Sequence, residues 1–184
     1  CSSDLGTPLT LLQQTLAEAG QYLPCESPLF GTAASGAASV TVSGAVATLG
    51  GMVAAGLSGP GRMAAGAVRD FVLGATLMDG QGEIKRFGGT VMKNVAGYDV
   101  ARALTGSMGT LGLLLDVSIK TLPLAPAEAT LCFELDQPRM IEQLNRWSAQ
   151  PLPLSASLWQ STQGAGVLHL RLRSEEHTSE LQSH

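Results

Sequence analysis

The spacing of apolar side chains predicts one amphipathic helix near the start of the chain. Leucines recur three and four residues apart after Thr7-Pro8, a pair typical of a helix N-cap (Thr7) and first turn (Pro8). Gly20 is suited to end this helix, because glycine readily adopts the left-handed conformation of a C-cap. The inward face of the helix is expected to consist of Leu9, Leu12, Leu16 and Ala19.

Strand-like runs dominate the middle of the chain. Two of them, 71–79 and 83–87, flank the turn sequence Gly80-Gln81-Gly82 and predict a hairpin. A third apolar run, 113–122, directly follows a glycine-rich segment, and Asp99 is placed to cap a short helix before that segment. This part of the chain therefore predicts a sheet with helices packed around it.

Beyond Pro123 and Pro126 the pattern changes to that of a β-α-β-β unit. Its four elements are expected at 130–135, 136–150, 155–160 and 167–171. We therefore expect two parts, 6–122 and 123–172, and the second resembles the start of a domain.

Both ends of the chain depart from these patterns. Residues 1–5 (CSSDL) and 173–184 (RSEEHTSELQSH) have no apolar period, and the second segment holds two of the three histidines. We interpret both as non-native ends. An ordinary polar tail is the alternative for 173–184.

Composition narrows the function classes. With 45% hydrophobic and 14% charged residues, the 184-residue chain predicts a globular core. Aromatic residues make up only 4% and the net charge is −4, which argues against a nucleic-acid-binding surface. The three cysteines, Cys1, Cys25 and Cys132, form no CxxC motif, so no zinc or iron–sulfur site is expected from this chain alone.

A long segment without charge imitates a membrane span. No charged residue lies between Glu26 and Arg62, a gap long enough to cross a bilayer. Its residues are mostly Gly, Ala, Ser and Thr, whereas membrane insertion is driven by Leu, Ile and Phe. A glycine-rich ligand loop after a low-complexity insert at 31–45 is therefore favoured, with a membrane segment as the alternative.

Two clusters of small residues are the strongest functional signal. The first occupies 48–59 and the second 106–112, immediately before a predicted strand. Small side chains let a backbone approach a flat or charged ligand, and successive N–H groups in such turns bind phosphate oxygens. A close-packed turn between core elements is the alternative for the first cluster. The GxGxxA match at 59–64 contains Pro60 and lacks a preceding strand, so NAD binding is not favoured.

The two clusters belong to an ordered set of four motifs. They are TLGGMVAAGLSGPGR at 48–62, RDFVLG at 69–74, KNVAGYD at 93–99 and GSMGTLG at 106–112. Together they resemble the FAD-binding PCMH-type domains of the vanillyl-alcohol oxidase family. Within that family, the likeness is to the smaller flavoprotein subunits of bacterial glycolate oxidases.

The resemblance implies an α/β (α+β) fold. It implies a two-lobed FAD domain lacking its N-terminal part and followed by the start of a cap domain. It also implies non-covalent FAD, with the first cluster along the flavin and pyrophosphate and the second at the adenosine end. The positions implied are Thr48, Leu49, Gly50, Gly51, Ala54, Ala55, Gly56, Ser58 and Gly59, followed by Gly109, Thr110, Leu111 and Gly112.

Three features depart from the family pattern. The family's first pyrophosphate loop would lie before Gly6. Met108 stands where relatives often carry Glu or another polar residue. The insert at 31–45 is longer than the usual link between the LPCE and LGG motifs.

The resemblance also implies a function. FAD would accept a hydride equivalent during oxidation of a small 2-hydroxy acid such as glycolate, and electrons would then pass on. The implied partners are a larger flavoprotein subunit and an iron–sulfur subunit. The implied location is cytoplasmic, or peripheral at the inner membrane through those subunits. A non-catalytic scaffold subunit that keeps the FAD fold is the alternative.

No residue of the chain is identified as a catalytic base. Lys93, Asn94 and Tyr98 are candidates to bind a substrate carboxylate. Arg69 and Asp70 read as strand neighbours on opposite faces, either as an ion pair or with one facing the flavin. His169 is interpreted as structural.

Overall fold

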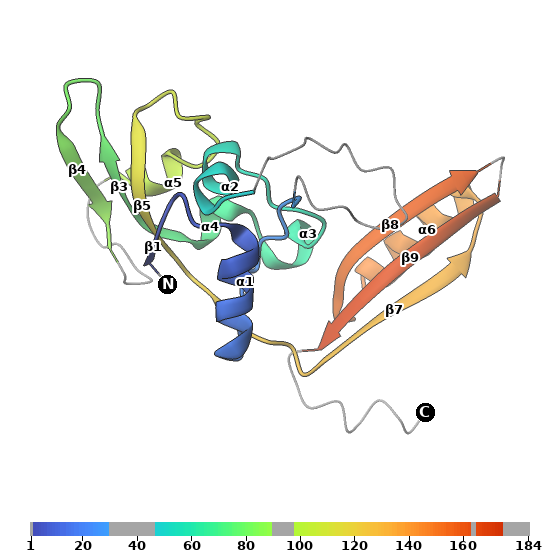
Figure 1. Ribbon diagram of the computed structural model, residues 1–184. Helices are drawn as coiled ribbons and strands as arrows, with labels where there is room; N and C mark the ends of the chain where they lie inside the picture. The colour runs from blue at the N-terminus through green and yellow to red at the C-terminus, as the bar shows by residue number, and fades with distance from the viewer. Residues whose placement is uncertain (1, 30–46, 90–97, 163–164, 175–184) are drawn as a thin grey trace. The chain divides into compact units, whose positions relative to one another are not determined.

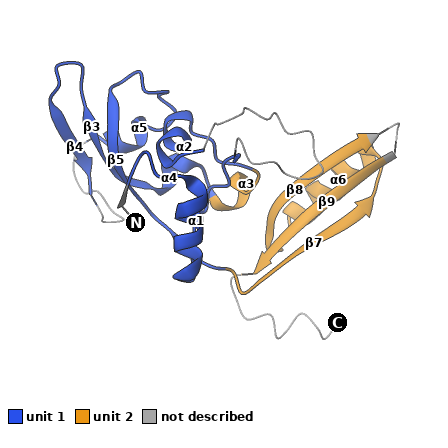
Figure 2. Ribbon diagram, in the orientation of Figure 1, with its two compact units in different colours: residues 1–59, 66–124 blue, residues 60–65, 125–184 orange. Residues whose placement is uncertain are grey.

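The computed structural model describes two compact units of the chain. The described residues are 2–29, 47–89, 98–162 and 165–174. Figure 2 distinguishes unit 1, residues 1–59 and 66–124, from unit 2, residues 60–65 and 125–184. Expectations for the insert at 31–45, for Lys93 and Asn94, and for residues 175–184 lie outside the described residues.

Unit 1 is built on a four-stranded antiparallel sheet (Figure 1). Its strands, in spatial order, are β1 (Ser2–Asp4), β5 (Leu113–Ile119), β3 (Val72–Met78) and β4 (Ile84–Gly88). The predicted hairpin is confirmed, since β3 and β4 pair with Met78 opposite Ile84. The outer strand β1 comes from residues 1–5, the segment that the sequence patterns set apart.

The hairpin turn is held by one carboxylate. Asp79 Oδ1 accepts hydrogen bonds from the N–H groups of Gln81 at 2.9 Å and Glu83 at 3.0 Å. The Lys85 ammonium binds the other carboxylate oxygen. The Lys85 hydrogen bond first, and then the two N–H groups, hold the pKa of Asp79 below its usual range.

The first helix, α1 (Leu9–Glu18), follows the predicted stripe but begins one residue later than expected. Leu9, Leu12 and Leu16 are buried, whereas Ala19, expected on the same face, follows the helix and is exposed. Gly20 has the expected left-handed conformation with φ 69°. The N-cap is Pro8 and not Thr7, because the Thr7 carbonyl already accepts the N–H of Leu49. After α1, the short strands β2 (Gln21–Tyr22) and β6 (Leu122–Pro123) form a separate ribbon.

Three short helices complete unit 1: α2 (Leu49–Ala55), α4 (Val68–Phe71) and α5 (Val100–Ala103). The predicted cap of α5 is confirmed, because Asp99 Oδ1 accepts the N–H of Arg102 at 3.2 Å. The core of unit 1 lies where these helices and α1 meet the sheet. Its most buried side chains include Leu9, Leu49, Val53, Val68, Val72, Leu104 and Val117.

Unit 2 has the predicted β-α-β-β order. Its antiparallel sheet runs β7 (Ala127–Glu134), β9 (Ala165–Ser174) and β8 (Leu154–Thr162) in space. Helix α6 (Gln137–Ser148) lies against one face of this sheet (Figure 1) and is capped by Asp136, which accepts the N–H of Arg139 at 2.9 Å. The ring centroids of Phe133 and Trp147 are 5.2 Å apart across that interface.

Strand β9 continues into the segment that the sequence patterns set apart. It ends at Ser174, and the Arg173 guanidinium donates to the Glu128 carboxylate on β7 at 2.7 Å. Residues 173 and 174 therefore belong to the sheet of unit 2.

As for the membrane alternative, no helix within the described residues combines the length and the apolar composition needed to cross a bilayer.

Candidate cofactor site

The first small-residue cluster is a helix, which corrects the expectation of a loop. Helix α2 begins after Thr48, whose Oγ1 accepts the N–H of Gly51 at 3.1 Å, and ends at Gly56 with φ 66°. It forms because Leu49, Met52 and Val53 lie on one face and are buried, each at most 3% exposed. The glycines and alanines of the segment are thereby left on the opposite face.

Every N–H group of the first turn of α2 already has an acceptor within the protein. The Thr7 carbonyl accepts the N–H of Leu49 at 3.0 Å. The Leu5 carbonyl accepts that of Gly50, also at 3.0 Å. Thr48 accepts the next two groups, one through its side chain and one through its carbonyl. This turn can therefore offer a ligand a flat surface, but no free N–H donors.

The second cluster packs directly on the end of α2. The Gly106 N–H donates to the Val53 carbonyl and the Met108 N–H to the Ala54 carbonyl, both at 2.9 Å. Met108 adopts φ 54°, an uncommon conformation for a residue with a large side chain. A Cβ at Gly56 would lie 3.3 Å from Gly106 Cα. The close approach of the two clusters thus depends on glycine at position 56.

A neutral cavity of about 340 Å³ lies where the two clusters meet. Among the described residues, no charged side chain lines it. Its lining residues are Leu5, Gly50, Ala54, Gly109, Gly112, Leu113 and Leu114. The structure thereby brings together Gly50 and Ala54 of the first predicted set and Gly109 and Gly112 of the second.

The second cluster supplies the open side of this cavity, and N–H groups without a partner among the described residues lie in the same turn. A Cβ at Gly109 would meet no atom within 4 Å, whereas one at Gly112 would lie 2.7 Å from the Met78 carbonyl oxygen. The N–H groups of Gly109 and Leu111 make no hydrogen bond to any described residue. A side-chain-poor, neutral hollow with unpaired N–H donors fits a dinucleotide, because N–H groups bind phosphate without a lysine.

Two predicted contact residues are instead used to pack the chain. Ser58 is 5% exposed, and its hydroxyl donates to the Gly56 carbonyl at 3.2 Å and accepts the Val68 N–H at 3.1 Å. A Cβ at Gly59 would lie 2.1 Å from the Glu26 carbonyl oxygen. The structure therefore places both residues in a turn that is held against the segment Leu23–Ser27.

The other predicted residues lie around the cavity without lining it. Thr48 caps α2 through its side chain. The Thr110 hydroxyl donates to the Ser107 carbonyl at 2.7 Å, and Leu111 is 56% exposed. The remaining members of the predicted set are Leu49 in the core of unit 1 and Gly51, Ala55 and Gly56 on or next to α2.

Arg69 and Asp70 lie in helix α4, so their interpretation as strand neighbours is wrong. Asp70 Oδ2 accepts the Ala67 N–H at 2.9 Å, while Arg69 Nε lies 3.9 Å from Asp70 Oδ1. The Asp70 carboxylate therefore caps the start of α4, the helix that leads directly into β3. Tyr98, a candidate substrate contact, is 97% exposed.

The GxGxxA match at 59–64 does not have the structure of a dinucleotide-binding turn. It leads into a single helical turn, α3 (Arg62–Ala65), in unit 2. The described element before it is helix α2, where a Rossmann motif requires a buried strand. The motif therefore lacks the strand, turn and helix arrangement that a Rossmann motif requires.

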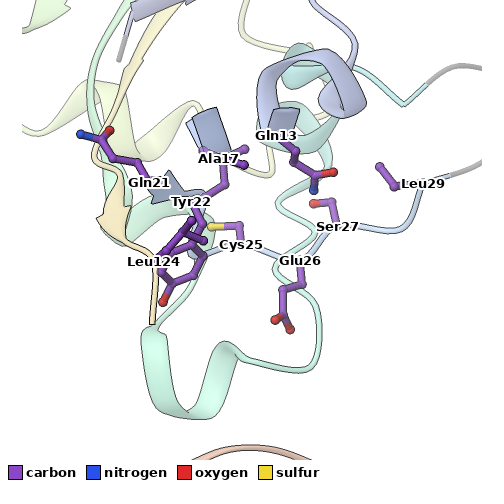
Figure 3. A pocket seen from close by; sticks show the side chains of 10 residues that line it. Gln13, Ala17, Gln21, Tyr22, Cys25, Glu26, Ser27, Leu29 and Leu124 are labelled. Atoms are coloured by element: carbon purple, nitrogen blue, oxygen red, sulfur yellow. The ribbon is translucent and has the colours of Figure 1, made fainter. Parts of the chain in front are cut away.

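A second cavity, which the sequence patterns did not predict, lies beside residues 23–28. Figure 3 shows this hollow of about 290 Å³, which is lined by Tyr22, Cys25 and Leu124 among others. Burial, and then the charges of Asp70 and Glu26, raise the pKa of the Cys25 thiol to about 12. The thiol is therefore neutral at physiological pH. The alternation of the apolar residues Leu23 and Cys25, both of which are buried, was the sequence pattern that could have indicated a packed segment here.

The sequence matches a known cofactor-binding family. Residues 32–88 match the family described as FAD binding domain. Glycolate oxidase subunit GlcE of Escherichia coli (strain K12) is 46% identical over 82% of this chain and 39% of that protein. Glycolate oxidase subunit GlcD of Bacillus subtilis (strain 168) is 36% identical over 47% of this chain and 18% of that protein. D-lactate dehydrogenase of Anaerostipes hadrus is 38% identical over 42% of this chain and 16% of that protein.

A solved structure supports the same fold. Alkyldihydroxyacetonephosphate synthase superposes with a TM-score of 0.72, covering 94% of this chain and 34% of that one, at 14% identity. The chain is thus a mixed helix-and-strand protein with the PCMH-type FAD-binding fold, and the cofactor of this domain is FAD. Within that class it is similar to glycolate oxidase subunit GlcE, of which it spans 39%.

Proposed function

We propose that the chain is the FAD-binding part of a 2-hydroxy-acid oxidoreductase subunit, with glycolate as the substrate. The observation that carries this proposal is the meeting of two glycine clusters around one neutral cavity. Similarity to two glycolate oxidase subunits and a D-lactate dehydrogenase supports the substrate class. Bound FAD would supply the redox chemistry, accepting a hydride equivalent and passing electrons on.

In this proposal the chain's own residues bind and shield the cofactor. The unpaired N–H groups of Gly109 and Leu111 donate to phosphate oxygens. The small side chain of Ala54 allows close approach to α2, whereas Gly50 makes room for Leu5. Leu113 and Leu114 exclude water from the wall of the cavity, which strengthens those hydrogen bonds. The other predicted residues, Ser58 and Gly59 among them, shape the turn that follows α2.

The proposed partners are a larger flavoprotein subunit and an iron–sulfur subunit that receives the electrons. The names of the GlcE and GlcD relatives identify them as subunits of a complex. We propose a cytoplasmic location, peripheral to the inner membrane through those partners. Such an assembly would divide flavin binding and electron transfer between different chains.

A non-catalytic scaffold role is the second candidate. The observation that favours it is the first turn of α2, where every N–H group is already paired within the protein. A chain in which this turn serves packing could keep the FAD fold for assembly. Flavin content and turnover distinguish the two functions.

Ala54 is the residue to change in a direct test, because it lines the cavity from α2 while the core-facing side chains of that helix are left unchanged. Ala54→Leu fills part of the hollow and is expected to lower flavin retention by about tenfold, since the added side chain would have to displace the cofactor or the backbone. Ala103→Leu, on the exposed side of α5, is the matched control and should retain flavin. The measurement is bound flavin per protein, from the visible absorbance of the purified complex.

Turnover is tested on the same material. The complex should reduce an artificial dye with glycolate or D-lactate and no added NAD. A complex that binds flavin but reduces no dye with either acid would support the scaffold role. Equal flavin content in Ala54→Leu and the parent protein would contradict the cavity assignment.

A further inference from the structure

The turn at 107–110, within the second cluster, holds a large side chain in an uncommon backbone conformation. Met108 and Gly109 have consecutive positive φ values of 54° and 75°, and the Thr110 N–H donates to the Ser107 carbonyl at 3.0 Å. This combination matches a type I′ turn, whose two central positions favour Gly, Asn and Asp. Among the described residues, Met108 is the one non-glycine residue with a positive φ. The chain therefore keeps a methionine where the backbone disfavours it.

Packing against α2 maintains this conformation. The Met108 N–H donates to the Ala54 carbonyl at 2.9 Å, and both Ala54 and Gly109 line the cofactor cavity. The turn cannot relax at Met108 without moving away from α2. Backbone outliers that the surrounding structure maintains are concentrated at functional sites, so this outlier points to a use for the methionine side chain.

The Met108 side chain is open to solvent. It is 72% exposed, as against 3% for Met52 in α2 and 95% for Met63 in α3. Exposed thioethers are the ones that peroxides convert to the sulfoxide, a polar group. An oxidant in solution can therefore reach the sulfur of Met108 and that of Met63, but not that of Met52.

The N–H groups next to Met108 are those that the proposed function assigns to phosphate. Neither the Gly109 N–H nor the Leu111 N–H makes a hydrogen bond to any described residue. The thioether of methionine is a weak acceptor and leaves such donors available. A sulfoxide oxygen is a stronger acceptor, and the methionine side chain is long and flexible enough to fold back on the residues that follow it. Oxidation would thus give these donors an acceptor within the protein.

We propose that Met108 is an oxidation site at which hydrogen peroxide lowers the affinity of the cavity for FAD. This inference rests on the proposed function, because it concerns the same phosphate-binding turn. One oxygen atom of the peroxide bonds to Sδ as the O–O bond breaks, and the other oxygen leaves as water. The sulfur loses two electrons and the peroxide gains them. Methionine sulfoxide reductases reverse the modification.

Titration with FAD before and after oxidation tests the proposal. The 184-residue chain is treated with hydrogen peroxide, desalted and titrated with FAD, with flavin fluorescence as the readout. Peptide mass spectrometry measures the oxidised fraction of each methionine. Oxidation of Met108 is expected to raise the dissociation constant for FAD about fivefold, because the phosphate must displace one intramolecular hydrogen bond. Met52 is expected to stay reduced.

Two leucine variants separate Met108 from the other methionines. Met108→Leu keeps an apolar side chain of similar size but cannot form a sulfoxide, so its affinity for FAD should be the same before and after peroxide. Met63→Leu removes an exposed methionine that does not line the cavity, and it should show the same fivefold loss as the parent chain. Treatment of the oxidised parent with methionine sulfoxide reductases should restore its affinity.

The outcomes distinguish this inference from the proposed function. An untreated parent chain that binds no FAD would contradict both. Binding by the untreated chain that is unchanged after Met108 is oxidised would overturn the inference alone. An equal loss in the parent and in Met108→Leu would also overturn it, because another residue would then be responsible. The same holds for a loss that the reductases do not reverse.

Discussion

Individual glycines in the two clusters have different structural roles, which residue type alone does not distinguish. A Cβ at Gly59 or Gly112 would overlap a backbone carbonyl, so these two positions are fixed by packing. Gly109 has open space on the side where a Cβ would stand, next to the cavity. Only the last type of glycine leaves room for a ligand. Sequence motifs cannot separate the types, because both require the absence of a side chain.

Gly112→Ala is expected to destabilise the protein by about 2 kcal/mol or more, through strain and overlap. The residue has φ 147°, and the new methyl group would lie 2.7 Å from the Met78 carbonyl oxygen. The midpoint of urea denaturation measures the loss. Gly80→Ala, in open space in the hairpin turn, is the control and should change stability little. Equal midpoints for Gly112→Ala and the parent would contradict the packing role.

Cys25 predicts a pH dependence of stability in the alkaline range. Burial raises the pKa of the Cys25 thiol from 9.0, its usual value, to about 12 in the folded protein, so folding disfavours the thiolate. The unfolded state then loses its proton first, and the stability that the neutral thiol contributes falls as pH rises from about 9 towards 12. Cys25→Ala should show a shallower decline over this range. Parallel stability–pH curves for the two proteins would contradict this.

Secondary-structure elements were predictable where apolar spacing was regular. The stripe of α1, the hairpin β3–β4 and the β-α-β-β order of unit 2 all follow from side chains that alternate or recur with a clear period. Helix α2 was missed because two glycines, which disfavour helices, outweighed its three buried side chains in the sequence pattern. The 3.3 Å contact between Cys132 Sγ on β7 and His169 Nδ1 on β9 was not predicted, because it depends on strand register, which brings together residues 37 positions apart.

Thr48 is expected to determine whether α2 forms. The helix has seven residues and contains Gly50 and Gly51, so its intrinsic stability is low. Thr48→Ala removes the acceptor of the Gly51 N–H and should cost about 1 kcal/mol of unfolding free energy. Because Ala54 and Gly50 line the cavity, flavin affinity should fall as well. Thr48→Ser retains the hydroxyl and should behave like the parent in both measurements.

At the scale of the whole molecule, the proposed site would hold a dinucleotide from one side only. The unpaired donors next to the cavity come from the second cluster, whereas the N–H groups at the start of α2 are already used. The family resemblance implies a further pyrophosphate loop before Gly6. The chain spans 39% of GlcE, its relative from Escherichia coli. The affinity of these 184 residues for FAD therefore tests whether one phosphate-binding segment is enough to bind the cofactor.

We expect the 184-residue chain to bind FAD at least about a hundredfold more weakly than full-length GlcE. Each charge-assisted hydrogen bond to the pyrophosphate contributes roughly 1.5–3 kcal/mol, and every 1.4 kcal/mol is a tenfold change in affinity. Removing two such bonds therefore accounts for a difference of this size. Titration of both proteins with FAD, followed by flavin fluorescence, gives the two dissociation constants. Equal, stoichiometric binding would show that the cavity between α2 and the 106–112 turn is sufficient, and that the family's first pyrophosphate loop adds nothing to affinity.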